Sequence, residues 1–174
     1  MEENQVRVII IMGVSGSGKT TVGKALAKKL GWTFFDGDDY HLTSSIEKMA
    51  NGIPLQDEDR WPWLNALREL VSECLESQQN AILACSALKQ SYRDLLLNGN
   101  PGAMLVYLQG SYEMIHDRLR IRPDHYMKAT LLKSQYEALE EPVDVLSLPA
   151  ALSVTELVEK ISEHFGLNHV QNLS

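Results

Sequence analysis

A short run of glycines, small polar residues and one lysine has the spacing that phosphate binding requires. Gly13 to Thr20 read GVSGSGKT, which matches the pattern G-x-x-x-x-G-K-[ST]. Glycines let the backbone approach phosphate oxygens, and successive N–H groups can point inward. Lys19 can reach the β- and γ-phosphates, and the Thr20 hydroxyl can bind Mg²⁺. We therefore expect a nucleotide triphosphate such as ATP here, held by Gly13, Ser15, Gly16, Ser17, Gly18, Lys19, Thr20 and Thr21.

The segments on either side of this loop fit the elements that it needs. Residues 8–12 are apolar without a break, as in a buried strand, and residues 21–30 carry apolar side chains at helical spacing. The loop therefore lies in a turn from a strand into a helix, whose N-terminus adds partial positive charge. The alternative is an accidental turn rich in glycine and serine, which would require neither the preceding strand nor the following helix.

Two aspartates follow the next predicted strand, at residues 33–35. Alternation along an extended segment would put Asp36 and Asp38 on the same side, facing the phosphate loop. Phosphoryl transfer needs Mg²⁺ near the β- and γ-phosphates and an acceptor oxygen placed in line. We expect Asp36 to bind the metal with Thr20, and Asp38 to orient the acceptor hydroxyl and take its proton. The alternative is a solvated acidic turn.

A cluster of basic residues, Arg118, Arg120, Arg122 and His125, surrounds a predicted helix break. On its own, a basic run is usually a solvated face. Beside a phosphate loop, a mobile lid over about residues 118–130 could close over ATP, exclude water and neutralise the transferring phosphoryl group. Within this lid we expect Arg118 to bind the nucleotide and Arg122 to act in catalysis.

Three further cations could contact an anionic acceptor. Arg60 lies in the segment DEDRWPWL and could bind a carboxylate or phosphate through two hydrogen bonds, although a surface arginine is an equal alternative. Lys89 and Arg93 lie one turn apart on the helix after the third strand, where small residues at 85–87 leave room for a ligand. A tight turn and a solvated helix face would also explain them. Cys85 is not expected to be a nucleophile, because no histidine base is evident near it.

Helices and apolar strands alternate along the chain, which predicts an α/β fold with a parallel sheet covered on both faces. Ligands of such sheets bind beyond the carboxyl ends of the strands, where the candidate residues lie. We expect a polar stretch after Tyr40, and Asp59 as the cap of a helix that begins at Trp61. The predicted strands are 8–12, 33–35, 81–85, 103–108 and 143–148, and the predicted helices are 21–30, 61–79, 89–97, 111–120, 128–139 and 154–165.

The composition is that of an ordinary globular protein, and we expect one domain over residues 1–174. Of the 174 residues, 44% are hydrophobic and 22% are charged. The formal net charge of −7 argues against nucleic acid or an anionic membrane as a partner. The sequence has no run long enough for a membrane span and no signal-peptide layout, and Cys74 and Cys85 have no disulfide or metal spacing. We therefore expect a cytoplasmic protein.

Taken together, these motifs resemble those of the small P-loop gluconate kinases, which are similar in fold to shikimate kinase and the nucleoside-monophosphate kinases. The resemblance runs from Val8 to about Pro142. Many enzymes share the phosphate loop, whereas the segments around Arg60 and Lys89 point to this family. The matching segments are 13–20, GDDYH at 37–41, IEKMANGIPL at 46–55, DEDRWPWL at 57–64, ACSALK at 84–89, YRD at 92–94, SQY at 134–136 and LE at 139–140.

The resemblance implies a three-layer P-loop kinase fold with a five-stranded parallel sheet, helices on both faces and a mobile lid. It also implies transfer of the ATP γ-phosphate to the 6-hydroxyl of D-gluconate, with Mg²⁺. Many members are homodimers, although nothing in this sequence identifies a symmetric interface. By position, Asp38 resembles the residue that orients the acceptor hydroxyl, and the residues similar to sugar-acid contacts are His41, Arg60, Lys89, Arg93 and Gln135.

Two other functions stay open at this point. A kinase for another small anion, such as shikimate or a nucleoside monophosphate, would use the same phosphate loop, strand-end aspartate and lid arginines. A nucleotide-dependent switch would bind ATP or GTP without an acceptor pocket. Paired strand-end acids and a basic lid argue against the switch, because nucleotide binding alone requires neither.

Overall fold

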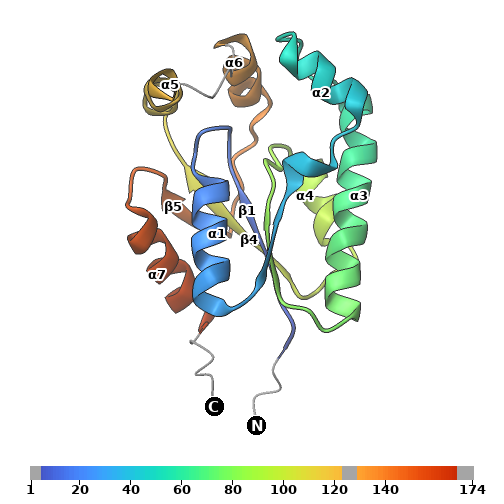
Figure 1. The fold of residues 1–174 in the computed structure, drawn as a ribbon, viewed down its shortest axis with the longest axis vertical. Helices are drawn as coiled ribbons and strands as arrows, with labels where there is room; N and C mark the ends of the chain where they lie inside the picture. Colours follow the sequence, from blue (N-terminus) through green and yellow to red (C-terminus); the bar gives the residue numbers. More distant parts are fainter. Residues whose placement is uncertain (1–4, 123–128, 168–174) are drawn as a thin grey trace.

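In the residues that the computed structural model describes, 5–122 and 129–167, five parallel strands form one central sheet (Figure 1). The strand bounds are β1 Val8–Met12, β2 Thr33–Asp36, β3 Ala81–Ala84, β4 Ala103–Gln109 and β5 Leu146–Pro149. The spatial order is β2-β3-β1-β4-β5, so the first strand lies in the middle. Every adjacent pair is parallel, as the sequence predicts.

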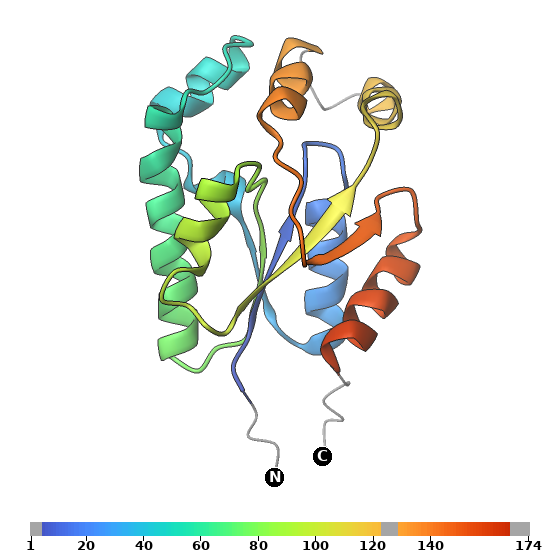
Figure 2. The same ribbon diagram turned by 180° about the vertical axis from the view of Figure 1, so that it is seen from behind.

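Helices cover both faces of this sheet, which confirms the predicted three layers (Figures 1 and 2). The helix bounds are α1 Lys19–Leu30, α2 Thr43–Ala50, α3 Asp57–Glu76, α4 Gln90–Leu97, α5 Tyr112–Ile121, α6 Ala129–Ala138 and α7 Val154–Phe165, with a short 3₁₀ helix η1 at Gly37–Tyr40. The pair α1 and α7 packs on one face and the pair α3 and α4 on the other, while α2, α5 and α6 lie toward the carboxyl end of the strands. None of the helices described is long and apolar enough to cross a membrane.

The alternation of side chains along β1 divides the core between the two faces. Val8, Ile10 and Met12 pack in the cluster with α3 and α4, whereas Ile9 and Ile11 pack in the cluster with α1 and α7. All five side chains are buried. A strand covered on both faces has no position for a polar residue, which explains the unbroken apolar run in the sequence.

The parallel arrangement brings the segments that follow β1, β2 and β3 to one edge of the sheet. The phosphate loop follows β1, and its Gly13 N donates to Ser86 O, in the loop after β3, at 3.3 Å. The helix η1 follows β2, and its Gly37 packs directly against the carbonyl of Ala84. This edge therefore gathers residues that are far apart in the sequence.

The region between residues 40 and 60 differs from the prediction. The sequence predicts a polar stretch, but α2 lies within it, and its apolar residue Ile46 is 50% exposed. This helix has only 8 residues, and its N-cap is Leu42 with no side-chain cap, so the sequence lacks the usual signal for a helix start. The helix α3 begins at Asp57 instead of Trp61, because Gln56 and Asp59 form a capping box in which Asp59 Oδ2 accepts from Gln56 N at 2.9 Å. Asp59 is thus the third helical residue and not the cap.

The last strand is also displaced from its prediction. The sequence predicts a strand at 143–148, whereas β5 covers Leu146–Pro149. Asp144 has a φ of +58°, a left-handed conformation that cannot continue a strand, and Val143 is 77% exposed. The predicted helix break at residues 121–127 lies mostly outside the described residues.

Replacing Gly37 with alanine should destabilise the protein, because a Cβ there would lie 2.6 Å from Ala84 O and 3.3 Å from Leu67 Cδ1. The carbonyl belongs to a central strand and cannot move aside, so we expect Gly37→Ala to lower the free energy of unfolding by about 1–3 kcal/mol. Urea unfolding measures this change.

The control for this prediction is Gly31→Asn at the end of α1. Gly31 has a φ of +69° and no atom within 4 Å of an added Cβ, and asparagine tolerates that conformation. We expect a change of less than about 0.5 kcal/mol for the control. Equal stability of the Gly37→Ala variant and the wild type would contradict the close packing of η1 on β3.

Candidate active site

The loop between β1 and α1 packs so closely that it requires glycines. Gly13 has a φ of +150°, and a Cβ there would lie 2.8 Å from Leu108 O. Gly16 has a φ of +82°, and a Cβ there would lie 2.9 Å from the side chain of Leu119 in α5. Ser17 Oγ is buried and has no hydrogen-bond partner among the residues described. An unpaired buried hydroxyl in a loop at a helix N-terminus fits the predicted phosphate ligand.

Lys19 begins α1 and turns its ammonium back onto the loop. Its Nζ donates to Val14 O at 2.8 Å. Burial lowers the pKa of Lys19, while the charges of Asp38, Cys85 and Asp36 oppose that shift. A buried ammonium whose bonded partner is a neutral carbonyl would be stabilised by an anion. The predicted phosphate contact of Lys19 is therefore favourable in this setting.

Thr20 and Asp36 form a pair of oxygen donors next to this loop. Thr20 Oγ1 donates to Asp36 Oδ2 at 3.0 Å. The described residues contain no group of three or more His, Cys, Asp or Glu side chains that could bind a metal. Mg²⁺ does not need such a group, since it commonly takes one or two protein oxygens and completes its shell with water and phosphate. The donor chemistry of the pair fits the predicted metal.

Asp38 reaches this edge by a different route from the one that the sequence predicts. It lies in η1 and not in an extended segment, so alternation does not apply. Asp36 Oδ1 accepts from Asp38 N at 3.0 Å, which caps η1 and turns the chain. The side chain of Asp38 is 84% exposed, and its charge acts on the pKa of Lys19. Its carboxylate is thus close to the phosphate loop and open to a ligand.

His41 lies beside Asp38 and is held by an aromatic stack. Its ring lies 4.2 Å from that of Trp63 at an angle of 17°, and Trp63 Nε1 donates to Gly37 O at 2.7 Å. His41 Nε2 lies 3.9 Å from Asp38 Oδ1. Burial lowers the pKa of His41, Asp38 opposes this shift and Arg60 reinforces it. The ring is therefore mostly neutral at pH 7 and can donate or accept a hydrogen bond.

Arg60 and Lys89 are connected through Tyr92 and Asp57. Arg60 Nη1 donates to Tyr92 OH at 3.0 Å, and Tyr92 OH donates to Asp57 Oδ1. Lys89 Nζ lies 3.0 Å and 3.2 Å from the two carboxylate oxygens of Asp57. The structure thus brings together two predicted acceptor contacts from different helices. Sequence reasoning gave Asp57 and Tyr92 no role at the site, although each lies three residues from a predicted contact, a spacing that places helical side chains together.

Arg93 is held by protein atoms and is only 1% exposed. Its Nη1 donates to Ala87 O and Leu88 O, and its Nη2 donates to Gln90 Oε1 and Glu140 O. The guanidinium therefore fixes the loop before α4 against the segment after α6. A contact between Arg93 and an acceptor stays a prediction.

Gln135 of α6 contacts the phosphate loop directly. Its Oε1 accepts from Ser15 N at 2.7 Å. The resemblance implied a sugar-acid contact for Gln135, which also stays a prediction. The Ser15 N–H is one of the donors that the sequence assigns to phosphate binding. The nucleotide and Gln135 would therefore compete for this hydrogen bond.

Arg118 of α5 also reaches the phosphate loop. Its Nη1 lies 3.2 Å from Gly16 O and 3.4 Å from Ser17 O, and its Nη2 donates to Ala150 O at 2.9 Å. Arg122 caps the C-terminus of α5 and is exposed. The centre of the predicted lid, residues 123–128 with His125, lies outside the described residues.

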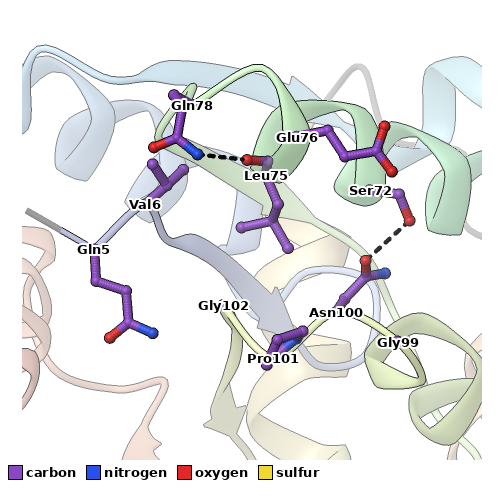
Figure 3. Close-up of a pocket in the computed structure, with 10 residues that line it drawn as sticks. All are labelled: Gln5, Val6, Ser72, Leu75, Glu76, Gln78, Gly99, Asn100, Pro101 and Gly102. Atoms are coloured by element: carbon purple, nitrogen blue, oxygen red, sulfur yellow. Dashed lines mark hydrogen bonds between the residues drawn. The ribbon is translucent and has the colours of Figure 1, made fainter.

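A hollow of about 820 Å³ lies at the opposite end of the sheet, before β1 and β4 (Figure 3). It is lined by residues before β1, the last turns of α3 and the turn at 99–102. Among the described residues of this lining, Glu76 is the one that carries a charge, and a carboxylate disfavours bound phosphate. The hollow therefore lacks the chemistry of a nucleotide site.

Several known proteins resemble this chain in sequence and fold. The family described as shikimate kinase matches residues 15–161. A probable gluconokinase of Mus musculus is 45% identical over 152 residues, which cover 78% of this chain and 83% of the relative. A gluconokinase of Gluconobacter oxydans is 40% identical over 162 residues, covering 91% of each chain. The crystal structure of a gluconokinase from Sinorhizobium meliloti 1021 is 38% identical and superimposes with a TM-score of 0.80, covering 94% of this chain and 98% of that one.

The buried ring of His41 should make the stability of the ligand-free protein depend on pH. Its pKa in the folded protein lies below the usual 6.5, so the unfolded chain binds more protons as the pH falls through 6.5. The free energy of unfolding should therefore decrease below that pH, with a slope of up to about 1.4 kcal/mol per pH unit from this residue.

Urea unfolding of the wild type and His41→Gln between pH 7.5 and 5.5 measures this slope. We expect His41→Gln to lose part of the pH dependence of the free energy of unfolding. The control is His116→Gln, which should keep that dependence because the His116 ring of the wild type is half-exposed. Identical pH dependence of the wild type and His41→Gln would show that His41 is protonated as easily in the folded state as in the unfolded state.

Proposed function

Because this chain belongs to the gluconokinases of the shikimate kinase family, we propose that it transfers the γ-phosphoryl group of ATP to the 6-hydroxyl of D-gluconate, giving 6-phosphogluconate. Its family makes it an ATP-dependent kinase. The observation that carries the choice of acceptor is the pairing, at one edge of the sheet, of a phosphate loop with the cations Arg60 and Lys89. A sugar acid has a hydroxyl that can receive the phosphoryl group beside the phosphate loop, and a carboxylate that can bind to the two cations.

At the nucleotide end, we assign phosphate binding to the loop N–H groups and Lys19. The buried Lys19 ammonium would exchange the Val14 carbonyl for β- and γ-phosphate oxygens, which restores its charge balance. Arg118 lies close enough to the loop to join the nucleotide contacts. Arg122, from the predicted lid over about residues 118–130, would neutralise the phosphoryl group as it moves.

Thr20 and Asp36 would hold Mg²⁺, which supplies charge neutralisation at the β- and γ-phosphates when it is bound. Both side chains already face each other at 3.0 Å. Their arrangement leaves the carboxylate of Asp38 separate from the metal pair, with its side chain free for the acceptor.

At the acceptor end, Asp38 would accept a hydrogen bond from the 6-hydroxyl and take its proton during transfer. The neutral His41 ring beside it can bond to a neighbouring hydroxyl, and Arg60 and Lys89 would face the sugar-acid carboxylate. This division gives the acceptor a fixed direction, with the reacting hydroxyl toward the phosphate loop and the carboxylate toward α3 and α4.

The net charge of −7 supports a small-molecule acceptor and not nucleic acid or a membrane surface as the partner. The cytoplasmic location, the homodimer and the single domain over residues 1–174 remain predictions from the sequence. Shikimate or a nucleoside monophosphate as acceptor is not favoured, since the probable gluconokinase of Mus musculus and the gluconokinase of Gluconobacter oxydans are 45% and 40% identical to this chain, whereas a solved shikimate kinase from Bacteroides thetaiotaomicron is only 22% identical and shows the common fold alone.

The acceptor is tested by ADP release from Mg-ATP with D-gluconate, shikimate and AMP in parallel. We expect acceptor-dependent release with D-gluconate and a product heavier by one phosphate, and no release with the Lys19→Ala variant. Release with shikimate or AMP instead would replace the proposed acceptor, and ATP binding without any acceptor-dependent release would favour a nucleotide switch.

The role of Asp38 is tested by Asp38→Asn, which removes the carboxylate and keeps the shape of the side chain. We expect kcat with D-gluconate to fall roughly 10²–10⁴-fold, because a positioned base is lost, while the Kd for ATP stays unchanged. Asp39→Asn, one residue further along η1, is the matched control and should keep normal turnover. Near-normal kcat in Asp38→Asn would contradict the assigned role.

A further inference from the structure

We propose that Asp57 sets the charge selectivity of the acceptor pocket, by neutralising one of the two cations there and leaving a net single positive charge. The inference rests on the proposed function, in which a sugar acid places its carboxylate between α3 and α4. It assigns a specificity-determining role to a residue that the family resemblance and the sequence motifs leave without one.

Three charged side chains, Arg60, Lys89 and Asp57, meet at this end of the site. Lys89 and Arg60 are the cations, with side chains 29% and 14% exposed, and Asp57 lies between them. The nearby Asp59 is already paired with Lys48 at 2.7 Å, so that pair adds no net charge. Among Arg60, Lys89 and Asp57, one positive charge is uncompensated where the sugar-acid carboxylate would lie, while the proposed place of Asp38 is at the other end of the acceptor, beside the reacting hydroxyl.

Asp57 is held in place and ionised. It is the first residue of α3, where the helix N-terminus favours a carboxylate. Hydrogen bonds from Tyr92 and Lys89 hold the pKa of Asp57 below its usual range. A carboxylate so restrained keeps its charge at neutral pH and does not swing away from the pocket.

The hydroxyl of Tyr92 connects Asp57 to Arg60 through two hydrogen bonds of opposite direction. Tyr92 gives its proton to Asp57, so the oxygen of its hydroxyl is left to accept from Arg60 Nη1 at 3.0 Å. Asp57 thereby orients Arg60 through Tyr92 as well as holding Lys89 directly. Loss of the carboxylate would both loosen Lys89 and add one unit of positive charge to the pocket.

These two effects can be separated with acceptors of different charge at the same carbon. D-gluconate carries one negative charge at C1, and D-glucitol 1-phosphate carries a dianionic phosphate there at pH 8, with the 6-hydroxyl kept in both. Loosening of Lys89 weakens both acceptors, whereas the added positive charge favours the dianion over the monoanion. The ratio of kcat/KM for D-glucitol 1-phosphate to kcat/KM for D-gluconate therefore reports the charge effect.

In Asp57→Asn we expect this ratio to rise about 3–10-fold, the effect of one unit charge a few ångströms away in a partly solvated pocket. Asp57→Glu keeps the charge and should keep the wild-type ratio, even where its KM for D-gluconate increases. Glu58→Gln is the matched control, since it removes the same charge from an exposed neighbour in the same helical turn.

A raised KM in Asp57→Asn with an unchanged ratio would overturn the charge role. If Asp57→Asn fails to fold, Lys89→Gln tests the charge role by a change of opposite sign. Loss of this cation should lower the ratio of the two kcat/KM values, and an unchanged ratio would overturn the charge role. Wild-type turnover is measured first. Absence of turnover with D-gluconate would overturn the proposed function and this inference together, whereas turnover with an unchanged ratio in the variants overturns the inference alone.

Discussion

One carboxylate, that of Asp36, connects the two halves of this site. Its Oδ2 accepts from the Thr20 hydroxyl and its Oδ1 accepts from the backbone N–H of Asp38. The two partners belong to segments that follow β1 and β2, which are not neighbours, because β3 lies between them. The side chain therefore connects the start of α1 to η1 at this edge of the sheet. Whatever η1 presents, including Asp38 and the backbone carbonyl that Trp63 binds, depends on that connection.

The protein keeps the charges at the two ends of the site apart. At one end, the partly buried Lys19 donates to a carbonyl, so its charge is available to a ligand. At the other end, Arg60 and Lys89 are held by Tyr92 and Asp57, with both cations set against the same tyrosine ring. Polar groups held in place before the ligand arrives need little reorganisation during the reaction. The stack of His41 on Trp63 is buried and holds the His41 ring beside Asp38.

The sequence predicted the sheet well because its signals are local. An unbroken apolar strand and a glycine loop that leads into a helix require no knowledge of distant contacts, and both are confirmed. The prediction failed where a distant or a side-chain contact decides the structure. Asp59 looks like a helix cap from its neighbours alone, but its bond to Gln56 moves the start of α3 back by four residues from Trp61. The bond from Tyr92 to Asp57 joins two helices 35 residues apart, and no spacing rule indicates it by itself.

The proposed carboxylate-binding part of the acceptor site is concentrated in very little sequence. Asp57, Arg60 and Trp63 lie three residues apart at the start of α3, and their partners Lys89 and Tyr92 have the same spacing at the start of α4. The phosphate loop shares none of these residues. New acceptors could therefore evolve by substitutions in two helical turns while the inherited nucleotide chemistry stays intact. Such separability offers a physical reason why a single ancestral scaffold could diversify into kinases for chemically unlike small molecules.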